Sequence, residues 1–359
     1  MSFDILGIGT ALPTHTMSQD EASAMSADLI CRDERESRLL KTMLRRSRVV
    51  NRHTCVPHGI AYEWVGEDAA PSASPGPTTQ ERMELYAAHA GPLALEASAK
   101  ALAESAVATD DISHLITVSC TGFEAPGVDV QLIDQLGLLQ TTQRMHIGYM
   151  GCHGAINGLR VASALATSEP TARTLLCATE LCSLHYRFQW DEERILGNAL
   201  FADGAAALVG GQVASGAQAI CRLKATGSCL VPDSRDTITW RIGNHGFEMT
   251  LSNRVPDLIR KHLKPWLAQW LASHRVPMSA VGSWAVHPGG PRILDAVDEA
   301  LELDHEALAA SRHVLEQFGN MSSPTVLFIL QRLLATTASR PCVALGFGPG
   351  LMIEAALIE

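Results

Sequence analysis

Short apolar runs alternate along the chain with longer amphipathic stretches, and this alternation predicts strands followed by helices. Phe3 to Thr10 is an apolar run that ends in glycine turns, and we expect it to be the first strand. The charged stretch from Asp28 to Arg52 has helical spacing. After a loop rich in Pro, Gly and Ser at 68–77, the Ala-, Leu- and Glu-rich stretch from Glu81 to Ala106 predicts a long helix, broken or kinked at Gly91-Pro92.

From residue 114 onward, strand-like runs alternate with helical runs, a pattern that is typical of a largely parallel sheet. Gly211 to Gly216 could form a hinge between two similar βα halves. We therefore expect an N-terminal half of residues 1–213 and a C-terminal half of residues 214–359. The expected strands lie near 114–120, 145–149 (buried), 174–179, 205–210, 219–226, 282–286, 342–345 and 352–358, and the expected helices near 152–167, 256–274, 292–303 and 323–337.

Composition then narrows the class of protein. The 359 residues are 47% hydrophobic and 18% charged, which is typical of a folded globular chain. A formal net charge of -10 argues against nucleic acid as a partner. No apolar run approaches the ~20 residues of a membrane span, and Met1-Ser2-Phe3-Asp4 lacks the basic start of a secretory signal. We therefore expect a cytoplasmic protein without a membrane span.

The nine cysteines are odd in number, scattered, and mostly placed in apolar runs, unlike a secreted disulfide framework. They are expected to be reduced thiols. The sequence contains no Cys-x-x-Cys pair, and neither Cys152-His153 nor Cys177-x4-Cys182 repeats as a structural zinc site requires. We expect no metal.

One cysteine stands where a nucleophile would stand. Gly151-Cys152-His153-Gly154-Ala155 follows a predicted strand and opens a helix of small residues. The positive end of the helix dipole favours the thiolate and should lower the thiol pKa from ~8.5 toward neutrality. A buried cysteine that serves as a small hydrophobe explains the same residues, so the local sequence leaves both interpretations open.

Two further motifs end in turns. His287 leaves an apolar strand in Trp284-Ala285-Val286-His287-Pro288-Gly289-Gly290-Pro291, where it could donate to an oxyanion and pair with a thiolate. A structural histidine is the alternative. Asn320 lies in Phe318-Gly319-Asn320-Met321-Ser322-Ser323-Pro324, where simple N-capping by Asn320 or Ser322 is the alternative to a catalytic role.

Taken together, these motifs resemble one family in order, spacing and neighbouring residues. The chain resembles the type III polyketide synthases, that is, the chalcone synthase family with its thiolase fold. The resemblance covers nearly the whole chain and rests on Gly9-Thr10-Ala11-Leu12-Pro13, Thr121-Gly122-Phe123-Glu124-Ala125-Pro126-Gly127-Val128-Asp129, Gly151-Cys152, Leu200-Phe201-Ala202-Asp203-Gly204-Ala205-Ala206-Ala207, His287-Pro288-Gly289-Gly290-Pro291, Gly319-Asn320-Met321-Ser322-Ser323 and Gly346-Phe347-Gly348-Pro349-Gly350.

The resemblance implies an α/β protein with a thiolase fold, in which two similar βα halves form a layered αβαβα sandwich. It implies an acyltransferase that extends an acyl-CoA starter by decarboxylative condensation with malonyl-CoA and needs no prosthetic group. Cys152 would carry the acyl chain, while His287 and Asn320 would bind the thioester carbonyl and promote decarboxylation. These residue types suit an enolate, because its negative oxygen needs hydrogen-bond donors and a carboxylate would repel it.

The same resemblance implies a cavity and its gate. Phe201 matches one of two gatekeeper phenylalanines, and Met249 replaces the other, which should give a more deformable gate. Thr121, Ala125 and Cys182 are small, as in bacterial members that accept fatty acyl-CoA, whereas Trp240 and His185 should shrink the polyketide side. We therefore expect a long aliphatic starter, two or three extensions, an alkylpyrone- or alkylresorcinol-type product, and a cavity lined by Phe201, Met249, Thr121, Ala125, Cys182, His185, Trp240, Phe247 and Ser322.

A run of basic residues could hold the phosphates of CoA, although an ordinary solvated helix face would show the same charges. The run consists of Arg38, Lys41, Arg45, Arg46, Arg48 and Arg52. The family places phosphate-binding residues in the helix formed by this run. Arg46 aligns best, and Lys41 or Arg45 would substitute for two positions that fall on Leu39 and Thr42.

The family also implies a homodimer in which the residue before a proline, here Ala125, reaches the partner's cavity.

Related activities remain as alternatives. Thiolases need a second cysteine in the loop that matches Gly346 to Gly350, and this loop has none. A ketoacyl synthase of the carrier-protein-dependent type III class shares Cys, His and Asn but would extend once, and a polyketide synthase with a short or aromatic starter would share the whole site. An inactive acyl-CoA-binding scaffold is the alternative that is not an enzyme. The loop at 346–350 joins two apolar strands, so we expect a hairpin turn under the active site. It should not be a nucleotide-binding loop, because no helix follows it to bind a phosphate.

Overall fold

The computed structural model describes residues 3–66, 70, 72–192, 194–213, 219–336 and 338–359. Three predictions lie partly outside these ranges: the loop at 68–77, the hinge at 211–216 and the helix that was expected to end at residue 337. The predicted boundary after residue 213 lies at the edge of a described range. The strands are β1 (Phe3–Ala11), β2 (His15–Ser18), β3 (Asn51–Thr54), β4 (His114–Ser119), β5 (Gln143–Gly148), β6 (Arg173–Leu181), β7 (Asp203–Gly211), β8 (Cys221–Leu230), β9 (Ile238–Gly243), β10 (Gly246–Leu251), β11 (Ser283–Val286), β12 (Cys342–Gly348) and β13 (Met352–Ile358).

The helices are α1 (Gln19–Leu29), α2 (Glu34–Arg46), α3 (Ile60–Val65), α4 (Thr79–Ser105), α5 (Val128–Leu136), α6 (Gly154–Ser168), α7 (Leu196–Leu200), α8 (Val255–Ser273), α9 (Pro291–Leu301), α10 (Ala309–Phe318) and α11 (Thr325–Leu334). Short 3-10 turns are η1 (Thr109–Asp111), η2 (Gly151–His153), η3 (Cys182–His185), η4 (Met278–Ala280) and η5 (His305–Leu308).

Nine strands form one mixed sheet in the order β11-β12-β13-β8-β1-β7-β6-β4-β5. Among the described residues, only β4 with β5, β4 with β6 and β11 with β12 pair in parallel, so the expectation of a largely parallel sheet is wrong. The remaining neighbours are antiparallel, partly because short connections such as the turn between β12 and β13 can join only antiparallel strands. β1 joins the two halves through a short pairing of Phe3 to Ile5 with β8.

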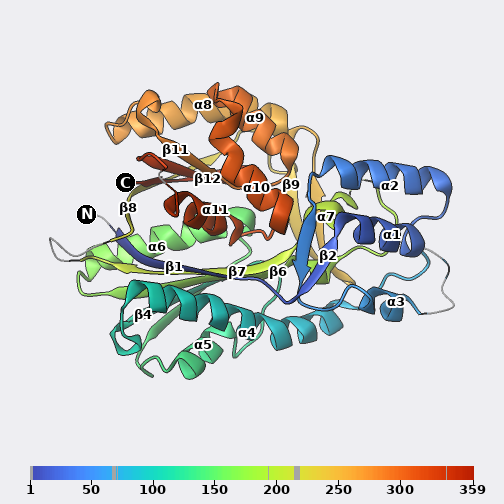
Figure 1. Cartoon of the computed structure of the whole chain (residues 1–359), viewed down its shortest axis with the longest axis horizontal. Helices are drawn as coiled ribbons and strands as arrows, with labels where there is room; N and C mark the ends of the chain where they lie inside the picture. The colour runs from blue at the N-terminus through green and yellow to red at the C-terminus, as the bar shows by residue number, and fades with distance from the viewer. Residues whose placement is uncertain (1–2, 67–69, 71, 193, 214–218, 337) are drawn as a thin grey trace.

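The sheet and helices are stacked in five layers, as the expected sandwich requires (Figure 1). The sheet has two parts, β11-β12-β13-β8 and β1-β7-β6-β4-β5. The helices α6 and α11 lie between the two parts. The helices α4 and α5 cover the outer face of the part that contains β1, and α8 and α9 cover the outer face of the other part. Small residues allow close packing in the central layer, since a Cβ at Gly158 of α6 would lie 2.5 Å from Leu176 of β6.

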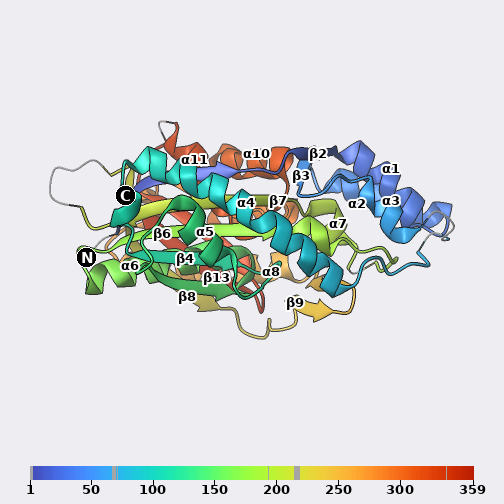
Figure 2. The same cartoon turned by 90° about the horizontal axis from the view of Figure 1, so that it is seen from below.

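Some elements differ from those expected. The helix α4 is continuous through Pro92, begins with a capping box between Thr78 and Glu81, and lies across the sheet (Figure 2). The strand β5 was expected to be buried, but it is the edge strand and most of its residues are exposed. The sequence pattern also missed the β9–β10 hairpin and α10.

The helices α1, α2 and α3 gather at one end of the molecule, next to α7 (Figures 1 and 2). They share a small core with Phe188 and Ile195, which is separate from the cores of the five layers. Of the predicted site residues, Thr121, Cys182 and His287 follow the ends of β4, β6 and β11 within two residues.

Candidate active site

Cys152 lies in the η2 turn that leads into α6, as the sequence predicts. Gly151 has a φ of +71°, and a Cβ there would lie only 2.6 Å from Pro349, so both the backbone angle and the close approach require glycine. Pro349 belongs to the turn between β12 and β13. The expectation that this loop is a hairpin turn beside the nucleophile is therefore confirmed.

The environment of Cys152 differs from that expected for a cysteine at a helix start. Burial raises the pKa of the Cys152 thiol to about 11, although hydrogen bonds from Ser322 and Asn320 oppose this shift. The expectation of a pKa near neutrality is wrong for the resting site, because the thiol precedes the first residue of α6 and is surrounded by apolar groups and thiols. Cys152 is therefore a neutral thiol at neutral pH, and it would have to lose its proton before its sulfur could attack a carbonyl.

The amide of Asn320 has one end fixed and the other end free to donate. Its Oδ1 accepts the backbone N–H of Ser322 at 2.8 Å, so its Nδ2 points its hydrogens elsewhere. Ser322 itself has a φ of +57°, which marks a tight turn before α11. N-capping through the Asn320 side chain is absent from the described α11, whose N-cap is Pro324. Because the Asn320 side chain reaches Cys152, it is placed to donate to a carbonyl oxygen bound at the thiol.

His287 extends the end of β11, where its backbone N–H donates to Leu345 of β12 at 2.8 Å. The side chain is fully buried, and burial lowers the pKa of His287 to about 3. Within the described part of the chain, neither ring nitrogen has a hydrogen-bond partner. A buried imidazole with two free nitrogens can donate one hydrogen bond and accept another, so His287 is available to a substrate.

A small cavity of about 40 Å³ opens beside Cys152. Six of the predicted cavity residues meet here, together with a third thiol, Cys120, which the sequence analysis did not single out. The lining consists of Cys120, Thr121, Gly151, Cys152, Cys182, Phe201, Ile238, Thr239, Trp240, Met249, Ser322, Gly348 and Pro349.

Trp240 forms a wall that closes this cavity on one side. Its Nε1 donates to the Cys120 carbonyl at 2.6 Å, and its ring meets the ring of Phe201 edge-on at 6.0 Å. His185 supports the wall: its Nδ1 accepts the Phe247 N–H at 2.9 Å, so its Nε2 carries the proton and donates to the Thr121 carbonyl at 2.6 Å. Burial lowers the pKa of His185 to about 3, so this wall is neutral.

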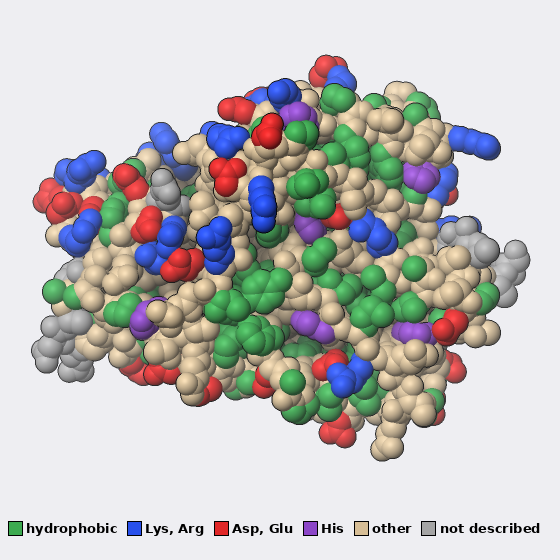
Figure 3. Space-filling view, turned by 180° about the vertical axis from the view of Figure 1, so that it is seen from behind, with side chains coloured by type: hydrophobic (Ala, Val, Ile, Leu, Met, Phe, Trp, Pro, Cys, Tyr) green, Lys and Arg blue, Asp and Glu red, His purple; other side chains and the backbone are tan. Residues whose placement is uncertain are grey.

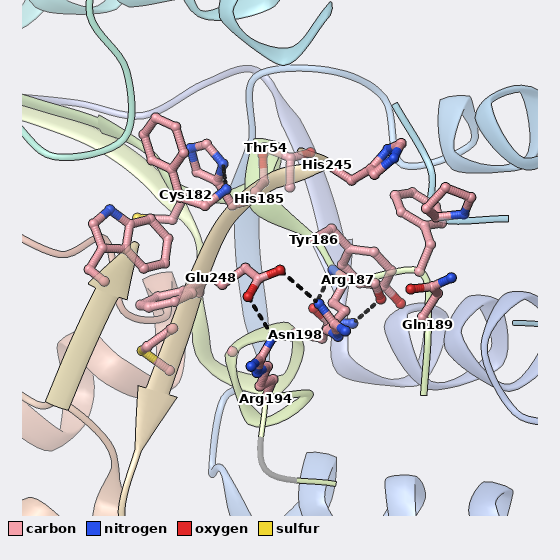
Figure 4. Close-up of a pocket in the computed structure, with 18 of the residues that line it drawn as sticks. Thr54, Cys182, His185, Tyr186, Arg187, Gln189, Arg194, Asn198, His245 and Glu248 are labelled. Carbon is pink, nitrogen blue, oxygen red and sulfur yellow. Dashed lines mark hydrogen bonds and ion pairs between the residues drawn. The ribbon is translucent and has the colours of Figure 1, made fainter. Parts of the chain in front are cut away.

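A second cavity of about 240 Å³ lies on the other side of the wall (Figure 4). It shares Cys182, Phe201, Trp240 and Met249 with the cavity beside Cys152. Its outer part is charged, because Glu248 forms ion pairs with Arg194 at 2.5 Å and with Arg187 at 3.6 Å. His185 and Phe247, both predicted from the sequence, also line this second cavity.

Ala125 is the one predicted cavity residue that lines neither the cavity beside Cys152 nor the second cavity. It is exposed and lines a third cavity of about 210 Å³ with Gly122, Phe123 and Val128. Cys120 and Thr121 line the cavity beside Cys152, whereas the following residue, Gly122, lines the third cavity. Ala125 therefore lines a different cavity from the Cys152 of its own chain.

Lys41 and Arg45 line a large groove of about 1040 Å³. The groove lies between α1, α2, α10 and the start of α9. Arg48 lines the same groove, whereas Arg46 is exposed on α2 and is not among the lining residues. Arg52, which the sequence placed in the same basic run, is instead buried at 3% exposure.

The sequence analysis missed Glu180, a fully buried carboxylate in β6. It accepts hydrogen bonds from the Cys120 N–H at 2.9 Å, the Thr121 hydroxyl at 2.7 Å and the Ser323 hydroxyl at 2.5 Å. Burial raises the pKa of Glu180, and these donors lower it. The carboxylate ties the end of β4 to the segment that carries Asn320. A lone acid in an otherwise apolar strand was the available signal.

Among the described residues, no group of three His, Cys, Asp or Glu side chains lies close enough to hold a metal ion. The described helices include none that is both long and apolar enough to cross a membrane.

Comparisons with known proteins cover the whole chain. The family described as "Chalcone and stilbene synthases, N-terminal domain" matches residues 2–213, and "Chalcone and stilbene synthases, C-terminal domain" matches residues 222–359. A protein named "Alpha-pyrone synthesis polyketide synthase-like Pks18" from Mycobacterium tuberculosis is 30% identical over 365 residues, which cover 99% of this chain and 90% of that protein. The 1,3,6,8-tetrahydroxynaphthalene synthase of Streptomyces peucetius subsp. caesius is 31% identical over 360 residues, covering 99% of this chain and 92% of the synthase.

Solved structures agree with these matches. The crystal structure of PKS-I from the brown alga Ectocarpus siliculosus has a TM-score of 0.90 and 30% identity, covering 100% of this chain and 98% of that one. The C-terminal type III polyketide synthase domain of Steely1 from Dictyostelium has a TM-score of 0.89 at 24% identity, with 100% and 99% coverage, and this match bears on the fold alone.

Proposed function

Since the chain belongs to the chalcone and stilbene synthase family, and is thus a type III polyketide synthase of the acyltransferase class, we propose that it loads an acyl-CoA starter on Cys152 and extends it with malonyl-CoA. The observation that carries the proposal is the site itself: a buried thiol reached by the free end of the Asn320 amide, in a chain whose His287 has both ring nitrogens free. No prosthetic group and no metal take part in it.

Loading begins with a neutral thiol and a neutral imidazole. The Cys152 sulfur attacks the thioester carbonyl, the thiol proton passes to His287, and the carbonyl oxygen becomes an oxyanion that the Asn320 Nδ2 stabilises. When the tetrahedral intermediate collapses, the C–S bond to CoA breaks and the proton on His287 goes to the departing CoA sulfur. The products are acyl-Cys152 and free CoA.

Extension uses the same donors. Malonyl-CoA loses CO2, and the electron pair of the broken C–C bond moves onto the thioester as an enolate whose oxygen accepts hydrogen bonds from His287 and Asn320. The enolate carbon then attacks the acyl-Cys152 carbonyl, and the Cys152 sulfur leaves as a thiolate, which gives the extended acyl-CoA. For the next extension this thiolate attacks the new thioester carbonyl, the C–S bond to CoA breaks, and the CoA thiolate takes up a proton from water. After the last extension the Cys152 thiolate takes up a proton from water and returns to the neutral thiol. Phe201 and Met249 keep water from the reacting carbon, which favours condensation over simple protonation.

For the starter, we propose a long aliphatic acyl chain and a pyrone or resorcinol product with few extensions. The small Thr121 and Cys182 line the cavity beside Cys152 and support a narrow acyl path there, while Trp240 leaves only about 40 Å³ for the polyketide. Ala125, which lines a different cavity of its own chain, would border this path from the partner subunit of a dimer. The name of the mycobacterial relative, which refers to α-pyrone synthesis, agrees with a pyrone product.

A panel of starters tests this proposal. Each buried methylene contributes about 0.8 kcal/mol, or roughly fourfold in affinity, so kcat/KM should rise from acetyl- through hexanoyl- to lauroyl- or palmitoyl-CoA and be lower for an aromatic starter. Mass spectrometry of the products counts the extensions. Ala125→Phe should shorten the preferred chain, whereas Ala125→Ser, which hardly changes the volume, is the matched control.

A maximum at acetyl- or aromatic acyl-CoA would contradict the acyl path and leave the condensation chemistry intact. A single extension from a malonyl group on a carrier protein, with none from malonyl-CoA, would indicate a ketoacyl synthase instead.

The phosphates of CoA are proposed to bind at the groove along α2. Lys41 and Arg45 line it, and in the described structure neither forms an ion pair with a carboxylate, so both ammonium and guanidinium groups are free for phosphate. Arg46 lies on the same helix but faces solvent, so its part in CoA binding stays a prediction.

We also propose a homodimer. Figure 3 shows hydrophobic side chains gathered across the middle of the face opposite to that in Figure 1. Ala125 is exposed in the single chain and could reach the cavity of a partner. The large hydrophobic residues exposed along the segment that includes Ala125 and β5 are Phe123 at 54%, Val130 at 37%, Leu139 at 45%, Met145 at 40%, Tyr149 at 38% and Met150 at 37%.

Light scattering at micromolar concentration should therefore give twice the mass of one chain. Phe123→Glu should shift the mass toward that of one chain, because it would bury a charge in the interface. A single-chain mass for the parental protein would reject the dimer.

A further inference from the structure

Arg52 of β3 is a buried cation in contact with the backbone that carries Phe201. Its guanidinium NH1 donates to the carbonyls of Asn198 at 2.6 Å and Phe201 at 3.2 Å, and NH2 donates to the carbonyl of Ala199 at 3.1 Å and to the Gln19 side chain. One side chain thus binds three carbonyls at the end of α7, those of Asn198, Ala199 and Phe201, while the Leu200 carbonyl between them accepts from another donor.

These carbonyls are ones that a helix leaves without partners. The last C=O groups of a helix have no intrahelical donor, so a guanidinium with several N–H groups in a fixed fork can satisfy several of them at once. Arg52 forms no ion pair with a carboxylate among the described residues, so the carbonyl dipoles balance its charge. Burial lowers the pKa of Arg52 only to about 10, which leaves it protonated at neutral pH.

The same segment is paired with Asn320. The Asn320 N–H donates to the Leu200 carbonyl at 2.8 Å, and the Ala202 N–H donates to the Asn320 carbonyl at 3.0 Å. Gly319 lies against this junction: a Cβ there would be 2.9 Å from the Ala202 Cβ and 3.8 Å from the Arg52 Cβ. The segments that carry Phe201 and Asn320 are therefore hydrogen-bonded to each other, and Arg52 is hydrogen-bonded to the first of them.

We propose that Arg52 is a positioning residue that fixes Phe201 and Asn320 relative to Cys152 by holding the end of α7. This inference rests on the proposed function of Asn320 and Phe201, and no contact between Arg52 and the substrate is required. Without the guanidinium, the freed carbonyls would turn toward other donors and the paired segments would shift. A displacement of about 1 Å in a catalytic group can cost on the order of 10²-fold in rate.

The test compares Arg52→Ala with Arg222→Ala. Arg222 forms an ion pair with the buried Asp4 at 2.6 Å, at the end of β1 and β7 that is remote from Cys152, so its loss also destabilises the fold. We expect Arg52→Ala to lower kcat for malonyl-CoA decarboxylation by about 10²-fold with little change in KM, since Lys41 and Arg45 are untouched. Methylguanidinium at millimolar concentration should restore part of this kcat, which would not follow from general destabilisation.

Hydrogen exchange supplies a readout that does not depend on activity. In Arg52→Ala the amides of Ala202 and Asn320 should lose protection, while Arg222→Ala leaves them protected. If these amides stay protected in Arg52→Ala, or if both variants lose activity equally, Arg52 is not a positioning residue. If the parental enzyme does not decarboxylate malonyl-CoA but the amides respond as expected, the proposed function fails and the structural inference stands.

Discussion

His287→Ala and Asn320→Ala are each expected to lower the rate of malonyl-CoA decarboxylation by about 10²–10³-fold, or ~2.7–4 kcal/mol of barrier. In the proposed mechanism both side chains donate to the enolate oxygen, which carries its negative charge only as CO2 leaves. The neutral state of His287 makes its ring a donor without a charge that would need a partner in the resting site. Release of CO2 and turnover of malonyl-CoA by the purified variants measure the effect.

The fold should tolerate both changes. Neither His287 ring nitrogen has a partner within the described chain, so His287→Ala breaks no side-chain hydrogen bond, whereas Asn320→Ala breaks the one that Oδ1 accepts from the Ser322 N–H. One hydrogen bond contributes only about 0.5–1.5 kcal/mol, so the melting temperature should move little in either variant. His114→Ala is a matched control, because His114 is also buried but lies at the start of β4, away from the ends of the strands that meet at Cys152. A His287 or Asn320 variant that unfolds, or that decarboxylates at the parental rate, would contradict the assigned roles.

Cys152→Ala should abolish loading and reduce product formation by at least about 10³-fold, because the proposed mechanism gives the acyl chain no other carrier. The cavity offers its own controls, since Cys120 and Cys182 line the same 40 Å³ space. Burial and the nearby Glu180 carboxylate raise the pKa of both thiols well above the usual value, so neither should act as a nucleophile.

Cys120→Ala and Cys182→Ala should therefore still be acylated by the starter, and Cys182→Ala should change mainly the chain-length preference. Turnover by Cys152→Ala near the parental rate would show that another thiol, or none, carries the chain.

The proposed catalytic residues could be singled out from the sequence because they lie in contiguous motifs at strand and helix ends. Cys152, His287 and Asn320 each lie beside a glycine turn, and the structure places all three next to the ends of strands or helices. The layered thiolase fold implied by the family was confirmed by the structural matches. The strand directions were predicted wrongly, because a single apolar run such as that of β7, which pairs antiparallel with both neighbours, is equally compatible with parallel pairing.

Other features depend on contacts between distant segments. The β9–β10 hairpin brings Trp240 opposite Met249, and its alternating pattern was a usable signal, but its short strands mix polar and apolar residues. Arg52 belongs by charge to a basic surface run, yet only the tertiary structure shows that carbonyls of α7 surround it. The pKa of Cys152 also depends on what packs around the thiol, and the local helix start gave the wrong direction.

The most direct test of the account is the covalent state of Cys152 during turnover. The parental enzyme is mixed with a long-chain acyl-CoA and then with malonyl-CoA, quenched at short times, digested and mapped by mass spectrometry. The account predicts that the peptide containing Cys152 carries the starter acyl group alone before malonyl-CoA is added, and the starter plus one or more CH2–CO units afterwards. Acyl groups on Cys120 or Cys182, or a Cys152 peptide that remains unmodified while product accumulates, would contradict it.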